Sequence, residues 1–152
     1  MNVGKSRQYT AGLYDLAEIR HFLQKRAAEL QVDPSTTYDL LLAVTELVTN
    51  TMIYGYQNEP GFIEAEMYLE KDSLIIHLRD HAAPFNPTQF PPPDLSISLE
   101  KRAIGGMGIF LAKQLVDQMI YRELPQGGNE VTLVIHQIST RQKEEGNDED
   151  RN

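Results

Sequence analysis

The sequence contains no cysteine, which excludes disulfide bonds, thiolate metal sites, iron–sulfur clusters and cysteine nucleophiles. An excess of basic residues is also missing, because 14 Lys and Arg stand against 22 Asp and Glu, a formal net charge of −8. Nucleic-acid backbones and anionic membranes attract basic surfaces, so this balance disfavours both as partners. No apolar run approaches the roughly 18 residues of a membrane span, and Met1–Thr10 lacks the apolar core of a signal peptide. We therefore expect a soluble, cytoplasmic protein.

The length of 152 residues fits one domain of ordinary size. Residues 140–152 (TRQKEEGNDEDRN) carry no apolar side chain and many acidic ones. Such a stretch cannot bury enough surface to offset the entropy lost on ordering, so it is predicted to be a disordered acidic tail. Residues 1–139 then form the single folded domain.

Two helices are predicted in the first third of the chain. The segment 15–30 is an amphipathic helix, because its apolar residues recur at spacings of three and four. The second helix begins at Asp33, whose side chain can cap free backbone amides, with Pro34 in the first helical turn. It runs to Gly55, a residue type that commonly ends helices.

The rest of the domain is rich in predicted strands. Between the second and third strands we expect a long proline-rich lid, Asp80–Ala103, followed by a glycine-rich turn and helix, Gly105–Asp117. Because helices and strands are segregated, we predict an α+β two-layer sandwich with helices on one face of a mostly antiparallel or mixed sheet. The predicted strands are Phe62–Glu70, Ser73–Arg79, Gln118–Arg122 and Glu130–Gln137.

Glu46 and Asn50 lie four residues apart and so share one face of the second helix. A carboxamide oxygen can bind a divalent cation, and a nearby carboxylate can orient or deprotonate a nucleophile. The structural alternative is a solvated stripe on an amphipathic helix.

Two further features follow along the chain. Asp80 ends a predicted strand, where a carboxylate can accept a hydrogen bond from an exocyclic amine such as that of adenine; it could equally be a turn residue. Gly105, Gly106 and Gly108 precede an apolar helix, where backbone amides and the helix N-terminus can face a phosphate group. A simple glycine hinge is the alternative.

Taken in order, these features resemble the anti-sigma factor serine/threonine kinases, small members of the GHKL superfamily of ATPases. The likeness runs from about Asp33 to Val134. It is carried by the asparagine box Thr45–Asn50 (TELVTN), by Asp80 with the following Pro-Phe-Asn-Pro, and by the second glycine box 105–111 (GGMGIFL).

The resemblance implies a Bergerat-type ATP-binding fold with ATP and Mg²⁺ as cofactors. Asn50 would then bind Mg²⁺, and Asp80 would hold the adenine amine. Glu46 would be the catalytic base for the attacking hydroxyl or the carboxylate that orients it. Phosphoryl transfer depends mainly on positioning the reacting groups and neutralising the charge of the phosphates, and these residues would supply both.

The glycine boxes complete the implied nucleotide site. Gly105, Gly106 and Gly108 would let the lid wrap the phosphates, and Lys101 is a charge partner for them or a solvated loop residue. Ala82 stands where the family usually has a glycine, so its methyl group is expected to narrow the part of the site that would hold the adenine ring.

By resemblance the protein is a serine/threonine kinase and anti-sigma factor. It would phosphorylate an anti-anti-sigma protein, bind a sigma factor and form a homodimer. Two alternatives stay open: a nucleotide-dependent binding module with little transfer, and a separated histidine-kinase catalytic domain that transfers phosphate to a histidine.

Overall fold

The computed structural model of the chain describes residues 5–10, 13–91, 96, 106–139 and 141. Within them, strands and helices follow one another in the order β1 (Lys5–Thr10), α1 (Leu13–Glu29), α2 (Pro34–Asn50), a π-helical turn (Thr51–Gly55), β2 (Phe62–Glu70), β3 (Ser73–Asp80), a 3₁₀ turn (Pro87–Gln89), α3 (Gly106–Leu115), β4 (Gln118–Glu123) and β5 (Asn129–Ile135).

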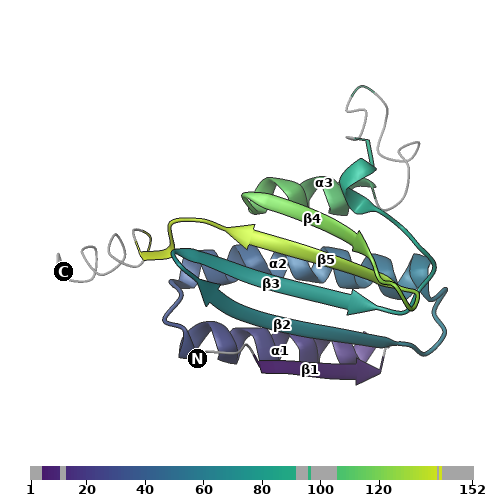
Figure 1. Cartoon of the computed structure of the whole chain (residues 1–152), viewed down its shortest axis with the longest axis horizontal. Coiled ribbons are helices and arrows are strands. Elements are labelled where there is room, and N and C mark those ends of the chain that lie inside the picture. Colours follow the sequence, from purple (N-terminus) through teal and green to yellow (C-terminus); the bar gives the residue numbers. More distant parts are fainter. Residues whose placement is uncertain (1–4, 11–12, 92–95, 97–105, 140, 142–152) are drawn as a thin grey trace.

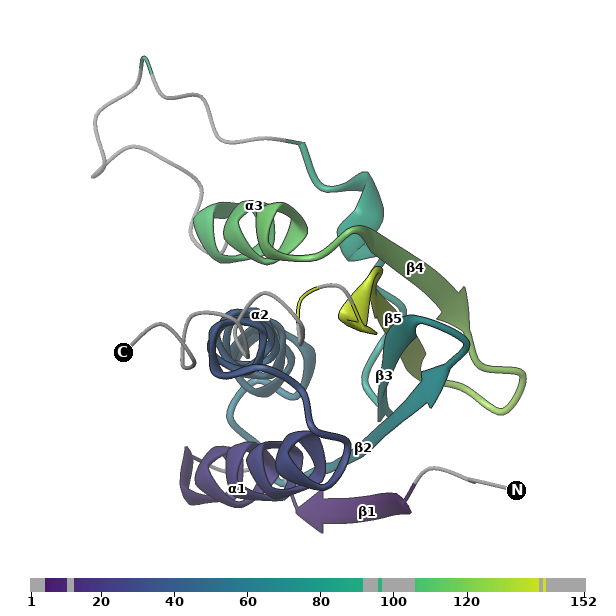
Figure 2. The ribbon, with the colours of Figure 1, turned by 90° about the vertical axis from the view of Figure 1, so that its left-hand side faces the viewer.

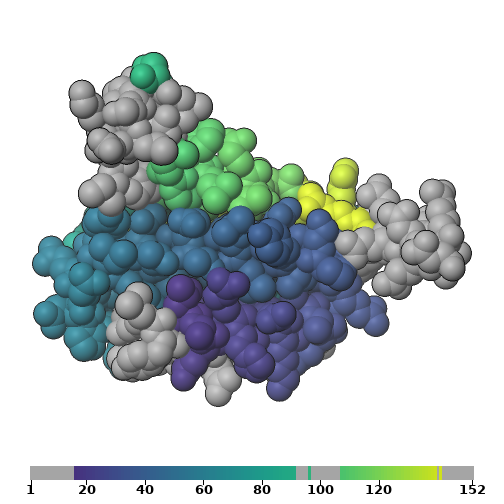
Figure 3. Space-filling model, turned by 180° about the vertical axis from the view of Figure 1, so that it is seen from behind, coloured from purple at the N-terminus to yellow at the C-terminus, as the bar shows by residue number. Residues whose placement is uncertain are grey.

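The described strands form one five-stranded sheet in the order β1-β2-β3-β5-β4, and each neighbouring pair is antiparallel. The α-helices lie together on one side of this sheet (Figures 1 and 2). Seen from behind, the helices cover the sheet (Figure 3). The predicted α+β two-layer sandwich is confirmed.

Helix α2 begins where the sequence predicted. The Asp33 carboxylate accepts a hydrogen bond from the Thr36 amide at 2.8 Å, and Pro34 occupies the first turn. The helical path continues to Gly55, but its last five residues widen into the π-helical turn, in which the Tyr56 amide bonds to the Thr51 carbonyl at 2.8 Å. A single π turn of this kind often lies at a functional site.

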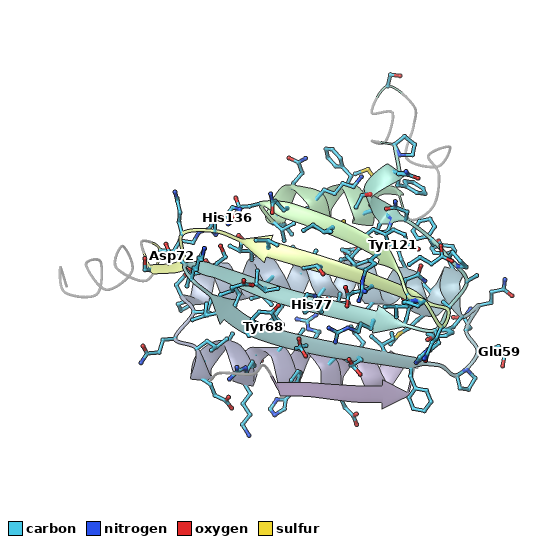
Figure 4. The ribbon with its side chains drawn as sticks, in the orientation of Figure 1. Glu59, Tyr68, Asp72, His77, Tyr121 and His136 are labelled. Atoms are coloured by element: carbon cyan, nitrogen blue, oxygen red, sulfur yellow. The ribbon has the colours of Figure 1, made fainter. Side chains whose placement is uncertain are left out.

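The alternation of β3 decides which side chains face the helices. Leu74, Ile76 and Leu78 are buried on the inner face, and period two places Asp80 on that same face at the strand end. His77 points to the opposite, outer face, together with Tyr68 of β2 (Figure 4). The sheet therefore has an apolar inner face that ends in a carboxylate.

Strand β1 was not predicted from the sequence. Its six residues, KSRQYT, are nearly all polar and show no apolar alternation. Because β1 pairs with β2 alone, it is an edge strand, and edge strands are commonly polar and charged. Its formation depends on pairing with β2 rather than on its own hydrophobic pattern.

Parts of two predicted segments lie outside the described residues. Only 80–91 and residue 96 of the predicted lid are described, and Asp80 belongs to β3. Of the tail only residue 141 is described, so the predicted disorder of 140–152 stays a prediction. In the described part of the chain, no helix is both long and apolar enough to cross a membrane.

The turn between β4 and β5 yields the first test. Gly127 and Gly128 both have positive φ angles, 96° and 103°, but a Cβ on Gly128 would overlap the Asp80 carbonyl, whereas a Cβ on Gly127 meets nothing within 4 Å. We expect Gly127→Ala to lower the free energy of unfolding by roughly 1 kcal/mol through φ strain alone. Gly128→Ala adds an overlap with the Asp80 backbone and should lower the free energy of unfolding by about 3 kcal/mol or more. Urea unfolding measures both, and equal losses would contradict the close packing of this turn on β3.

Candidate functional site

A cavity of about 410 Å³ lies where α2, β3 and the loop 81–91 meet. Asn50 reaches it from the last turn of α2, Asp80 from the end of β3 and Ala82 from the loop. The structure therefore brings three of the residues singled out in the sequence to one cavity, although up to 32 positions separate them along the chain.

The lining of this cavity is mostly apolar, with few polar groups. Pro84, Phe85 and Phe90 contribute one wall from the loop, and the Phe85 and Phe90 rings stack edge to face with centroids 5.9 Å apart. The rest of the apolar lining comes from α2, β2, β3 and α3, namely Leu47, Val48, Ile63, Leu78 and Ile109. An apolar hollow with a few placed polar groups is the usual form of a small-molecule site.

Asn50 has a buried amide nitrogen, Nδ2, with no hydrogen-bond partner among the described residues. Leaving such a donor unpaired costs roughly 1–3 kcal/mol, so a bound ligand with an acceptor would recover that energy. The side chain therefore suits a polar group of a ligand.

Glu46 lies one helical turn before Asn50 but is not among the cavity-lining residues. It packs instead against the first turn of α3, where a Cβ on Gly108 would overlap Glu46 Oε2 and lie 3.3 Å from its Cδ. Glycine at position 108 is thus what lets α3 approach the carboxylate so closely. The two residues of the predicted pair therefore lie in different places: Asn50 lines the cavity, and Glu46 lies at the contact between α2 and α3.

Within the described part of the chain, Asp80 is held through one of its two carboxylate oxygens. Oδ1 accepts hydrogen bonds from the Ala82 amide at 2.9 Å and from Asn129 Nδ2 at 2.8 Å. Burial raises the pKa of the Asp80 carboxyl above its ordinary value of 3.8, and the bonds from Asn129 and Ala82 oppose that rise. The carboxyl is therefore a desolvated acceptor whose ionised form depends on these donors.

Asn129 is the site residue that sequence reasoning missed. It is the register partner of Asp80 across β3 and β5 and is 4% exposed. Its Oδ1 accepts from the Phe85 amide at 2.9 Å and from the Tyr121 hydroxyl at 2.7 Å, so it ties the loop to the sheet. In the sequence Asn129 is visible only as part of a predicted closing strand pair, directly after two glycines, which does not reveal its pairing with Asp80.

Ala82 occupies its position without backbone strain, since it is not among the described residues with positive φ. Its methyl group is nearly buried and packs toward the π-helical turn, where a Cβ on Gly55 would lie 3.0 Å from it. The absence of a side chain at Gly55 thus makes room for the alanine.

Lys113 of α3 holds the loop from the other side. Its ammonium group donates to the carbonyls of Thr88 and Phe90, both at 3.1 Å. Of the predicted phosphate-binding residues, Gly106 begins α3 and Gly108 lies in its first turn. Lys101 and Gly105 lie outside the described residues.

With this geometry in place, comparison with known proteins identifies the family. A family model described as the histidine kinase-like ATPase domain matches residues 9–135. The chain belongs to the histidine kinase-like ATPase domain family. This membership confirms the superfamily that the sequence motifs indicated.

Relatives of this ATPase domain include the serine-protein kinase RsbW of Listeria monocytogenes, 30% identical over 86 residues, which are 53% of this chain and 55% of the relative. The anti-sigma F factor of Anoxybacillus flavithermus is 26% identical over 110 residues, 70% of this chain and 75% of the relative. The match to the Listeria kinase therefore spans about half of that protein's length. These names support the anti-sigma kinase branch.

A solved structure shows the same fold. The crystal structure of the RsbU and RsbW domains of a Mycobacterium tuberculosis protein superposes with a TM-score of 0.58 at 18% identity, covering 87% of this chain and 32% of that one.

The raised pKa of Asp80 predicts a stability effect of known sign. Because the folded state holds this proton more tightly than the unfolded state, ionisation of Asp80 lowers the free energy of unfolding as the pH rises above 3.8. We expect Asp80→Asn to be more stable than the wild type at pH 7 and to lose that advantage near pH 3, since an amide oxygen can still accept both hydrogen bonds. Thermal unfolding from pH 3 to 7 measures this, and an advantage that grows toward acid pH would contradict the burial of the carboxylate.

Proposed function

We propose that the protein is an ATP-binding serine/threonine protein kinase and anti-sigma factor that phosphorylates an anti-anti-sigma partner. The observation that carries this proposal is the shared cavity, into which Asn50 and Asp80 project from different elements. Membership of the ATPase-domain family and relatives named serine-protein kinase and anti-sigma F factor support it.

The adenine ring is proposed to lie at the β3 end of the cavity. There Asp80 would accept a hydrogen bond from the exocyclic amine, and the Phe85 side of the cavity would pack against the base. The phosphates would then extend toward the start of α3, where free amides and the helix dipole favour anions.

Magnesium is proposed to accompany the nucleotide, with Asn50 as its protein ligand. Among the described residues, no group of three or more His, Asp or Glu side chains could hold a metal ion by itself. That fits Mg²⁺, which keeps several waters and commonly binds through one or two protein ligands plus substrate phosphates. When bound, the ion would neutralise charge on the phosphates, and Asn50 would fix its place at the end of α2.

Glu46 is proposed to be the catalytic base. The incoming serine or threonine hydroxyl would give its proton to Glu46 while its oxygen forms the new bond to the γ-phosphorus and the bond to the ADP oxygen breaks. The contact of Glu46 with α3 at Gly108 places the carboxylate beside a helix N-terminus, where negative charge is stabilised.

The partners are proposed to be proteins of the same cell compartment, the cytoplasm. Relatives named anti-sigma F factor support a sigma factor and an anti-anti-sigma protein as ligands. The net charge of −8 disfavours direct nucleic-acid binding. A homodimer is part of the same proposal.

One observation favours a second function, a nucleotide-dependent protein-binding switch with little phosphoryl transfer. Glu46 packs against α3 and does not line the cavity. If α3 holds the Glu46 carboxylate there when ATP is bound, Glu46 could not accept the proton of the attacking hydroxyl. ATP would then only set the conformation of the lid.

The decisive assay incubates the full chain with Mg²⁺, ATP and a purified anti-anti-sigma protein. We expect Glu46→Gln to lower the transfer rate by roughly 10²–10⁴-fold, because the isosteric amide cannot take the proton, while ATP affinity stays within about twofold. Asn50→Ala should abolish both transfer and the gain in ATP affinity on adding Mg²⁺. Phosphoserine formation and calorimetric titration measure the two effects.

The exposed Tyr38→Ala on α2, remote from the cavity lining, is the control and should leave both transfer and affinity unchanged. If the wild type binds ATP tightly but transfers no phosphate, the protein is a nucleotide-dependent binding switch and not a kinase. A wild-type chain that binds no ATP would refute both functions.

A further inference from the structure

Every polar atom of the Asn129 side chain is engaged by the protein itself. Nδ2 donates to Asp80 Oδ1 at 2.8 Å, to the Ala83 carbonyl at 3.0 Å and to the Ala82 carbonyl at 3.4 Å. Oδ1 accepts from the Phe85 amide and the Tyr121 hydroxyl. Asn129 therefore has no group left for a ligand, and its effect on one must pass through Asp80 and the loop.

The orientation of this amide is fixed by its surroundings. Turning it over would set the Asn129 carbonyl against the Asp80 carboxylate and its NH₂ group against the Phe85 N–H. Either change opposes like groups and loses hydrogen bonds in a site that water does not reach freely. The donor of Asn129 consequently always faces Asp80.

We propose that Asn129 is a positioning residue that makes the nucleotide site select a 6-aminopurine over a 6-oxopurine. It does so by donating, together with the Ala82 amide, to Oδ1 of Asp80, so that Oδ2, which accepts no hydrogen bond from the described residues, serves as an acceptor for the base. This inference rests on the proposed nucleotide-binding function and adds to it the residue that sets base selectivity.

The physical argument concerns what Asp80 would do without its partner. Burial favours the neutral carboxylic acid, and the hydrogen bond from Asn129 opposes that effect on the Asp80 pKa more strongly than any other group. Without Asn129 the carboxyl keeps only the Ala82 amide on Oδ1, and in its protonated form it could donate a hydrogen bond to the oxygen of a 6-oxopurine. With Asn129 in place the carboxylate can only accept, so an amine is recognised and a carbonyl oxygen meets repulsion.

Other ionisable groups act on Asp80 more weakly. His81, the next residue, lowers the pKa of the Asp80 carboxyl through its charge. Burial chiefly raises the pKa of Tyr56 and of Tyr121 on β4, and the Asp80 carboxylate adds to both rises. Tyr121 acts mainly through its bond to Asn129 and so belongs to the same unit. Tyr121 lies on β4, near the end of the sheet that carries the β4–β5 turn (Figure 4).

The test compares the affinities of the full chain for ADP and for inosine diphosphate, which differ at the 6-position of the base, in the presence of Mg²⁺. We expect the wild type to prefer ADP, and Asn129→Ala to reduce that preference by about tenfold or more, the usual effect of losing a hydrogen bond to a charged group. Most of the change should be a gain in inosine diphosphate binding relative to ADP.

A pH profile separates positioning from general support of the fold. In Asn129→Asp two carboxyl groups face each other at the former hydrogen bond, so they share a proton at low pH and repel when both ionise. The affinity of this variant for ADP should fall as the pH rises from 5.5 to 8, whereas that of the wild type should stay flat. A structural role alone would weaken the binding of ADP and of inosine diphosphate alike at every pH, so the ratio of their affinities would stay flat.

The matched control is Thr132→Val on the same strand, which removes the bond to His77 Nδ1 on the outer face of the sheet. It should lower stability yet leave the preference for ADP unchanged. Should the Asn129 variants fail to fold, Tyr121→Phe, which frees one side of the Asn129 carbonyl, should lower the preference by a smaller factor.

Three outcomes would overturn the inference. If the Asn129 variants bind ADP and inosine diphosphate equally more weakly, with a flat pH profile, Asn129 is a structural residue only. Where those variants do not fold, an unchanged preference for ADP in Tyr121→Phe leads to the same conclusion. A wild type that binds neither nucleotide would instead refute the proposed function itself, and the selectivity argument with it. The first two results leave nucleotide binding intact, so the two failures are distinguishable.

Discussion

The pairing of Asp80 with Asn129 across β3 and β5 is the interaction on which the rest of the site depends. The antiparallel register sets these two residues opposite each other on the inner face, at the end of the sheet. One amide then connects the carboxylate, the loop 81–91 and β4 through hydrogen bonds of 2.7–3.0 Å. Because these bonds are partly shielded from water, leaving one partner without the others would cost free energy, so the network is expected to form as a unit. The cavity wall is built on that unit.

The cavity itself follows from how the two layers are assembled. The apolar inner face of the sheet packs on α1 and α2 along most of its length, but at the β3 end the side chains become polar and the helix widens into a π turn. There the layers are bridged by the loop, which α3 holds through Lys113. An apolar hollow lined by both Asn50 and Asp80 is the result. This arrangement connects the fold to nucleotide chemistry.

Local patterns in the sequence were sufficient to predict the helices and four of the strands, because Asp33 caps α2 and apolar alternation marks the strands from β2 onward. The polar β1 could not be predicted, since its pairing with β2 is a tertiary effect. Asn50 and Asp80 were predicted as site residues by resemblance, and their roles stay predictions. Asn129 could not be found this way, because its contacts depend on the register of strands 49 residues apart in the chain. The contact of Glu46 with α3 likewise depends on helix packing that spacing does not reveal.

The most direct test of this account is a two-dimensional ¹⁵N NMR titration of the full chain with ADP and Mg²⁺. The account predicts that the largest shifts fall on the amides of Ala82, Ala83 and Phe85 and on the side-chain amide of Asn129, while the outer face of the sheet around His77 stays nearly unchanged. Shifts confined to the outer face, or no shifts at saturating nucleotide, would contradict the assignment of the cavity as the nucleotide site.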